Sequence, residues 1–144
     1  MTIYARLVAL AVLSTLAVAA TAQVNSSPNA SADDCAVIGA IAQGQGSWPS
    51  APMSAKSFGV ACDWKALGLP QPAITTEEHP GLSFGYSQPV YSADGLQATV
   101  NYSYGGDHSA QGHPEQYFYT GSKCTAQKRD GKWQSLGCRM SFIT

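Results

Sequence analysis

The sequence has few charged side chains and no concentrated block of either sign. Charged residues make up 12% of the 144 residues, the formal net charge is −1, and the longest basic run is Lys128-Arg129. Binding of nucleic acid phosphates requires a concentrated positive surface. We therefore expect no nucleic-acid partner.

The sequence also lacks the short motifs of the common catalytic sites. It contains no G-x-S-x-G elbow, no H-E-x-x-H zinc motif and no glycine-rich phosphate-binding loop. Glu77-Glu78-His79 places carboxylates beside an imidazole, but Pro80-Gly81 follows directly, and this context is typical of a solvated turn. The absence of these motifs favours a non-catalytic role, and an enzymatic role stays open as an alternative.

Long apolar runs are missing after residue 20. The run from Leu7 to Ala20 is shorter than the roughly 20 residues that a membrane-spanning helix needs. Arg6 precedes this run and the small-x-small triplet Ala20-Thr21-Ala22 follows it, which completes the three parts of a secretory signal peptide. We therefore predict a signal peptide over residues 1–22, no transmembrane anchor in the mature chain, and a secreted or periplasmic bacterial protein.

The remaining chain is expected to form one domain behind a short leader. Residues 23–32 read QVNSSPNASA, a polar stretch of small residues without hydrophobic periodicity, which is typical of a flexible leader. Residues 33–144 suffice for one modest core. Their first stretch, DDCAVIGAIAQG, predicts a helix capped by Asp33 or Asp34 and ended by Gly44. Its apolar stripe consists of Val37, Ile38, Ile41 and Ala42.

The even number of cysteines after the predicted cleavage site points to disulfide bonds. These residues are Cys35, Cys62, Cys124 and Cys138, and their spacing matches no zinc signature. Four cysteines allow three pairings. We favour Cys35–Cys62 and Cys124–Cys138, with a β-bulge at Gly137 that brings the second pair opposite each other.

Apolar and polar side chains alternate along residues 82–91 and 96–104. This period of two predicts antiparallel strands whose even-numbered side chains face the core. Three-residue hairpin loops at 93–95 and 129–131 keep those side chains on one face. The predicted pairs are Val90 with Ala98, Phe118 with Phe142, and Cys124 with Leu136. The predicted buried positions of the last strand are Leu136, Cys138, Met140 and Phe142.

These elements predict an α+β fold. A short N-terminal helix packs on the even-numbered face of a four- to five-stranded antiparallel β-meander. Disulfide bonds cross-link this fold. Residues 45–57 are rich in Gly, Ser and Pro, which predicts an irregular loop.

The stretch GGDHSAQGHPEQ, residues 105–116, joins two predicted strands. His108, His113 and Glu115, with Asp107 as a further donor, offer nitrogen and oxygen ligands for a divalent metal such as zinc or copper. Gly105, Gly106 and Gly112 favour instead an exposed hairpin tip with no cofactor. Both interpretations stay open.

Aromatic side chains offer a second candidate site. Tyr91, Tyr117, Tyr119 and Trp133 occupy odd positions, opposite the apolar set. If that face is open, these rings can bind a glycan or a protein partner, whereas a loop folded over the face would bury them.

The phrase FGYSQPVYSADGLQATVNYSYGG, followed by QYFYTGSKCTAQKRDGKWQSLG, resembles the C-terminal pattern of small exported bacterial proteins of unknown function. In that family F/Y-S-x-P-V/I-F/Y-S-x-D-G precedes a strand, a hairpin and a D-G-K-W turn. The resemblance implies the meander and lends no catalytic residue. The matching residues are Ser87, Pro89, Val90, Tyr91, Ser92, Asp94, Gly95 and those from Asp130 to Trp133.

We therefore expect an exported, non-catalytic binding protein of the bacterial envelope or exterior, such as an inhibitor, an immunity-type protein or an accessory factor. The first alternative is a metal-binding protein or metal-dependent enzyme that uses the 105–116 loop. The second is a structural envelope protein.

Overall fold

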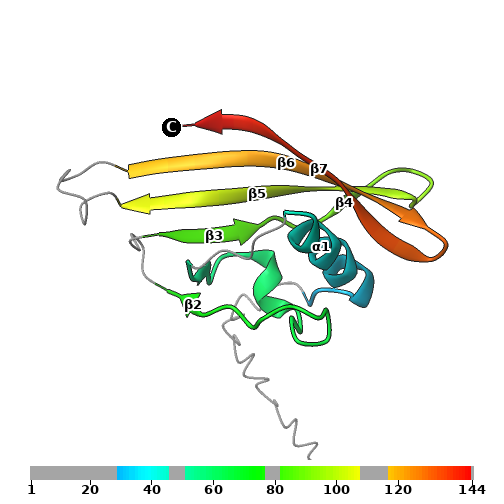
Figure 1. Ribbon diagram of the computed structural model, residues 1–144, viewed down its shortest axis with the longest axis horizontal. Coiled ribbons are helices and arrows are strands. Elements are labelled where there is room, and N and C mark those ends of the chain that lie inside the picture. The colour runs from blue at the N-terminus through cyan, green and yellow to red at the C-terminus, as the bar shows by residue number, and fades with distance from the viewer. Residues whose placement is uncertain (1–28, 46–50, 77–81, 108–116, 144) are drawn as a thin grey trace, which may run out of the picture.

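The computed structural model describes residues 29–45, 51–76, 82–107 and 117–143, although not the side chains of residues 107, 117 and 118. These residues form one α-helix, one 3-10 helix and seven strands around a single mixed sheet (Figure 1). The elements in chain order are α1 Ala32–Gly44, β1 Met53–Ser54, η1 Phe58–Ala61, β2 Ile74–Thr75, β3 Ser83–Tyr86, β4 Val90–Tyr91, β5 Gln97–Asp107, β6 Tyr117–Arg129 and β7 Lys132–Ile143. The predicted signal peptide lies outside the described residues.

The N-cap of α1 lies two or three residues earlier than the predicted Asp33 or Asp34. Ser31 is the N-cap, and its hydroxyl accepts a hydrogen bond from the Asp34 N–H while the Asp34 carboxylate accepts one from the Ser31 N–H. This capping box satisfies two amides that the helix leaves unpaired. The helix ends at Gly44 as predicted. The predicted stripe, Val37, Ile38, Ile41 and Ala42, is buried.

The sheet has the strand order β2-β1-β3-β5-β6-β7, and β4 also pairs with β5. The α+β class and the single helix on a largely antiparallel sheet are confirmed, but the prediction of four to five strands is wrong. The additional strands, β1 and β2, arise in segments that lack periodicity, and β1 pairs in parallel with both β2 and β3. Two-residue strands carry too little pattern for the sequence to reveal them.

The β4–β5 hairpin shows a register that the sequence did not predict. Tyr86 pairs with Tyr102, as the predicted register of even with even positions requires. The predicted partner of Ala98 was Val90, but Ala98 pairs with Tyr91. Ser87 absorbs the shift, because its N–H donates to the Asn101 carbonyl and its hydroxyl accepts from the Asn101 N–H. One extra residue before β4 therefore turns Val90 outward, where it is exposed.

The β6–β7 hairpin turns on two residues, Asp130 and Gly131, whose φ angles are 49° and 75°. Positive φ at both positions is the signature of a type I′ turn, so the predicted three-residue loop is wrong. A register shift then leaves Leu136 as the extra residue, and Cys138 stands directly opposite Cys124. The bulge expected at Gly137 is thereby confirmed, with Gly137 at φ 98°.

Both predicted disulfides are present, Cys35–Cys62 and Cys124–Cys138. The predicted burial of the last strand is wrong, however. Leu136, Cys138, Met140 and Phe142 are exposed, because α1 covers only the half of β7 near the turn (Figure 1).

The hydrophobic core lies between α1, the segment around η1 and the covered face of the sheet. Its largest fully buried side chains are those of Trp64, Phe84, Ile38, Ile41, Met53, Val37 and Val100. The close approach of the helix to β7 depends on Gly44, since a Cβ at this position would overlap the side chain of Ser135. Within the described residues, no helix is long and apolar enough to cross a membrane.

Candidate binding site

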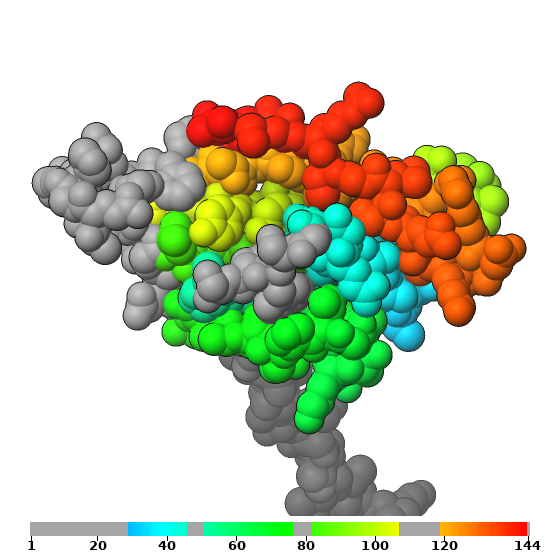
Figure 2. Space-filling view, viewed as in Figure 1, coloured from blue at the N-terminus to red at the C-terminus, as the bar shows by residue number. Residues whose placement is uncertain are grey.

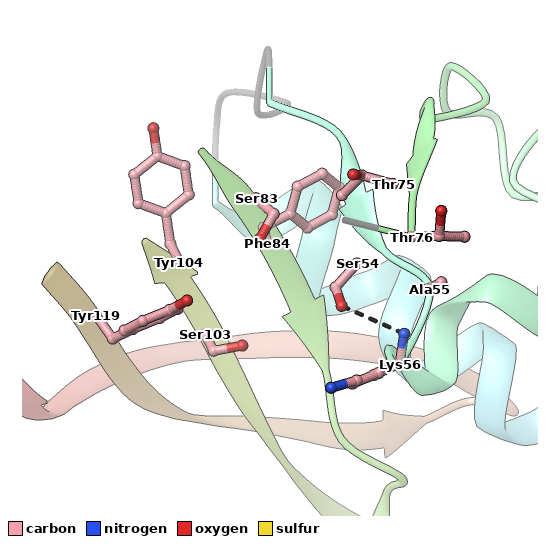
Figure 3. Close-up of a pocket in the computed structure, with 10 residues that line it drawn as sticks. All are labelled: Ser54, Ala55, Lys56, Thr75, Thr76, Ser83, Phe84, Ser103, Tyr104 and Tyr119. Carbon is pink, nitrogen blue, oxygen red and sulfur yellow. Dashed lines mark hydrogen bonds between the residues drawn. The ribbon is translucent and has the colours of Figure 1, made fainter. Parts of the chain in front are cut away.

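A pocket of about 250 Å³ opens where β1, β2, β3, β5 and β6 come together (Figure 3). Its size lies near the small end of ligand pockets, which run from roughly 300 to 1,000 Å³, and suits one ring or one short side chain. The lining residues are Ser54, Ala55, Lys56, Thr75, Thr76, Ser83, Phe84, Ser103, Tyr104 and Tyr119.

One wall of the pocket is built by the short strands β1 and β2. The Met53 N–H donates to the Ala73 carbonyl at 2.7 Å, and the Ala55 N–H donates to the Thr75 carbonyl at 2.8 Å. On the other side of β1, the Phe84 N–H donates to the Pro52 carbonyl at 3.1 Å. These bonds fix the backbone that carries Ser54, Lys56 and Thr75 into the lining.

A single serine anchors the chain that follows this wall. The Ser57 hydroxyl is buried, and it accepts hydrogen bonds from the Tyr86 N–H at 2.9 Å and from the Gly59 N–H at 3.2 Å. It thereby joins the start of η1 to the end of β3. Lys56, which directly precedes Ser57, is held at the rim because its own N–H donates to the Ser54 hydroxyl.

The opposite wall comes from the long strands β5 and β6. Tyr119 stands opposite Gly105, and Tyr104 stands opposite Thr120 on the next rung. Side chains alternate between the two faces of the sheet, so Tyr119 and Tyr104 lie on opposite faces. Tyr104 lies on the face that packs against the core. Figure 3 shows the Tyr119 ring extended toward Ser103.

The chemistry of the pocket is that of hydrogen-bonding recognition. Five lining residues carry aliphatic hydroxyls, two carry phenols, and Lys56 carries an ammonium group, whereas none of the described lining residues is Asp, Glu or His. Among the described residues, Lys56 has no carboxylate within ion-pair distance. The pocket can therefore stack a ligand on an aromatic ring, bond to its hydroxyls and attract its negative charge.

The predicted aromatic face is divided by the structure. Tyr119 lies on the expected face, and the side chain of Tyr117 lies outside the described residues. Tyr91 and Trp133 instead pack on each other, with ring centroids 5.8 Å apart, at the start of α1. Their predicted position on the open face is wrong, because the register shifts before β4 and at the two-residue β6–β7 turn exchange odd and even faces.

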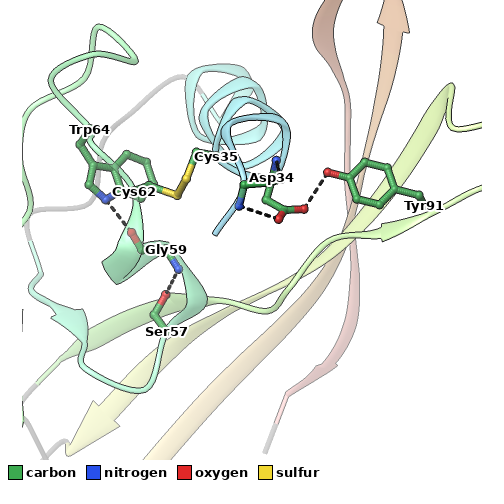
Figure 4. Close-up of a disulfide and its surroundings, with 8 residues drawn as sticks. Asp34, Cys35, Ser57, Gly59, Cys62, Trp64 and Tyr91 are labelled. Atoms are coloured by element: carbon green, nitrogen blue, oxygen red, sulfur yellow. Dashed lines mark hydrogen bonds between the residues drawn. A yellow bond between two sulfur atoms is a disulfide. The ribbon is translucent and has the colours of Figure 1, made fainter. Parts of the chain in front are cut away.

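These two aromatic residues hold the first turn of α1 to the sheet. The Tyr91 hydroxyl donates to the Asp34 carboxylate at 2.8 Å (Figure 4), and the Trp133 indole N–H donates to the Asp33 carboxylate at 3.0 Å. Lys128 completes the group, since its ammonium lies 3.0 Å from the Asp33 carboxylate and 5.4 Å from the Trp133 ring centroid. We call Asp33, Asp34, Tyr91, Lys128 and Trp133 the helix clamp.

The helix clamp shifts the acidities of its members. The Trp133 and Lys128 hydrogen bonds hold the pKa of Asp33 below its ordinary value. Burial opposes ionisation of Asp34, but hydrogen bonds from Ser31 and Tyr91 outweigh it and lower the pKa of Asp34. Burial, together with the neighbouring Asp34 carboxylate, raises the pKa of Tyr91.

We expect acid to weaken the clamp. Both carboxyl pKa values are depressed, so their stabilisation is present above an unfolded pKa of about 3.9 and is lost as the pH falls through the folded values. Because Asp33 is solvent-exposed, its share should not exceed about 1 kcal/mol. Urea unfolding at pH 6 and pH 3, compared between the parent and Asp33→Asn, measures this share. A variant that loses as much stability in acid as the parent contradicts the assignment.

The predicted metal site at His108, His113 and Glu115 lies outside the described residues. Elsewhere in the described chain, no group of three or more His, Cys, Asp or Glu side chains comes close enough to hold a metal ion. The metal hypothesis therefore stays a prediction.

No pattern in the sequence indicates that Lys56, Ser54 and Thr75 belong to one site. Lys56 lies in the stretch APMSAKSFG, and nothing in its neighbouring residues distinguishes it from any other exposed lysine. Only the parallel pairing of β1 with β2 and β3 brings these residues beside Tyr119. Comparison with protein-family models and with curated proteins finds no match for this chain. The resemblance to small exported bacterial proteins thus stays a prediction.

Proposed function

We propose that this chain is an exported, non-catalytic binding protein of the bacterial envelope or exterior, and that the pocket beside Tyr119 is its ligand site. The observation that carries the proposal is the composition of the pocket, which joins hydroxyl groups, the Tyr119 ring and one ammonium that has no carboxylate partner among the described residues. Two disulfides support an oxidising compartment outside the cytoplasm.

The ligand class that fits these groups is a saccharide unit bearing a carboxylate. A sugar ring presents C–H groups that stack on a tyrosine face and hydroxyls that exchange hydrogen bonds with serine and threonine. The Lys56 ammonium at the rim supplies a partner for the carboxylate, and a charge-assisted hydrogen bond is stronger than a neutral one. A neutral saccharide would leave this amine unused.

The experiment compares glucuronic-acid oligosaccharides with glucose oligosaccharides by isothermal titration calorimetry on the mature, oxidised protein. We expect the acidic ligand to bind more tightly, and Lys56→Ala and Tyr119→Ala each to weaken it about tenfold, as the loss of one charged or stacking contact does. Lys65→Ala is the matched control, because Lys65 is an exposed lysine outside the pocket lining.

Three results would overturn the proposal. These are the absence of binding to either saccharide, equal affinity for the acidic and neutral ligands, and an affinity that neither Lys56→Ala nor Tyr119→Ala changes. Circular dichroism of each variant confirms that the fold is retained.

A further inference from the structure

From Leu136 to its end at Ile143, β7 carries more exposed large apolar side chains than any other described element. Four of its side chains are large, apolar and at least half exposed: Leu136 at 53%, Met140 at 64%, Phe142 at 52% and Ile143 at 66%. Figure 2 shows this segment along the upper rim of the molecule, beyond the part of β7 that α1 covers. Large apolar side chains exposed together on one element can mark an interaction site.

The same segment presents a free backbone edge. Within the described residues β7 pairs with β6 alone and ends the sheet order. The Cα atoms of Cys124 and Cys138 are 3.9 Å apart, the close spacing of a pair that does not exchange backbone hydrogen bonds across the ladder. The N–H and C=O of Cys138 therefore point outward, where an added strand can bond to them.

Two cations occupy one rung of this edge without a carboxylate partner. Lys123 and Arg139 stand directly opposite each other, and both are exposed. Among the described residues, neither forms an ion pair. Like charges directly opposite each other on two strands are unfavourable. A carboxylate beside Arg139, on a strand added to β7, would offset this repulsion.

Charge and register together select the occupant. An antiparallel pairing with a second copy of this chain, centred on this rung, would bring another Arg139 against the first, which repulsion disfavours. Register shifts at Leu136 and at Ser141 divide β7 into the regularly paired segments Lys132–Ser135, Gly137–Met140 and Phe142–Ile143. This division disfavours a long self-paired edge. A short segment of another protein avoids both difficulties.

We infer that the C-terminal half of β7 docks an extended segment of a partner protein, in which carboxylates alternate with apolar side chains. Arg139 and Lys123 lie on the face opposite the core, whereas Met140 stands opposite Ser122 on the helix-covered face. The carboxylates of the added strand would therefore meet Arg139, with Lys123 one strand further in, and its apolar side chains would meet Met140 and Ile143. This surface is separate from the pocket and does not depend on its ligand.

The test uses a short synthetic peptide of alternating valine and glutamate and its valine–lysine counterpart. Each is titrated into the ¹⁵N-labelled, oxidised protein and followed by NMR. We expect the glutamate peptide to shift the amide resonances of Cys138, Arg139 and Met140, and the lysine peptide to bind about tenfold more weakly. Arg139→Glu should reverse this preference.

Arg129→Glu is the matched control, because Arg129 is an exposed arginine on the same hairpin but next to the turn, and it should leave the preference unchanged. The inference is overturned by equal affinity for the two peptides, by no binding, or by shifts confined to other strands. Self-association through β7 in sedimentation experiments would assign the edge to a second copy instead. Co-sedimentation with anionic vesicles that Arg139→Glu abolishes would assign it to lipid, and either outcome also overturns it.

Discussion

Trp64→Ala is expected to lower the free energy of unfolding by about 3–5 kcal/mol, the usual cost of removing a fully buried tryptophan. Trp64 has no exposed surface, and its ring lies 6.0 Å from that of Tyr86. Its indole N–H donates to the Gly59 carbonyl at 2.9 Å (Figure 4). The Gly59 backbone packs directly against the ring, since a Cβ added there would lie 3.0 Å from Trp64 Cζ2.

Trp64→Phe should cost less, about 1–2 kcal/mol relative to the parent, because most of the packing survives. The Gly59 carbonyl also keeps a second donor, the Cys62 N–H at 3.1 Å. Urea unfolding followed by far-UV circular dichroism measures both variants. Val60→Ala is the control, since Val60 lies in η1 next to Gly59 but is exposed, and should change stability by less than about 0.5 kcal/mol. A Trp64→Ala midpoint equal to that of Val60→Ala would show that Trp64 is not part of the core.

Loss of the Cys35–Cys62 disulfide is expected to destabilise the protein by about 3–4 kcal/mol, and loss of Cys124–Cys138 by about 2–3 kcal/mol. The first closes a loop of sequence separation 27 and the second one of 14, so the first restricts the unfolded chain more. The second also links strands that a two-residue turn already pairs. Paired Cys→Ala variants in urea unfolding measure the difference.

The two disulfides should also affect two different surfaces. Cys35–Cys62 holds α1 to the segment after η1, which continues from the wall that carries Lys56. Its removal should weaken saccharide binding, whereas removal of Cys124–Cys138 should weaken peptide binding at β7. Equal stability losses, or a saccharide affinity that only the Cys124–Cys138 variant changes, would contradict this assignment.

The sequence predicted the elements whose signals are local. The helix follows from the apolar stripe between Val37 and Ala42, and both disulfides follow from an even cysteine set and the spacing of a hairpin. The even-with-even register of β3 and β5 follows from a long alternation. Each of these signals spans several residues, so that a single misleading position does not change the outcome.

Registers and faces were predicted less well. One extra residue around Ser87 and a two-residue turn at Asp130-Gly131 were enough to move Tyr91 and Trp133 to the helix side. Since side chains alternate with a period of two, a shift of one residue reverses the face of every position that follows. Bulges of this size leave little trace in the pattern of apolar residues.

By itself, the sequence determined the fold class and the position of the helix, and it favoured the observed cysteine pairing, because hydrophobic periodicity and cysteine spacing act over short stretches of chain. Only the tertiary structure decided that Lys56 and Tyr119 share a pocket, and that the cation pair of Lys123 and Arg139 lies on an uncovered edge. These arrangements depend on strand pairing between distant segments. That pairing is set by the packing of the whole core, which no local stretch of sequence encodes.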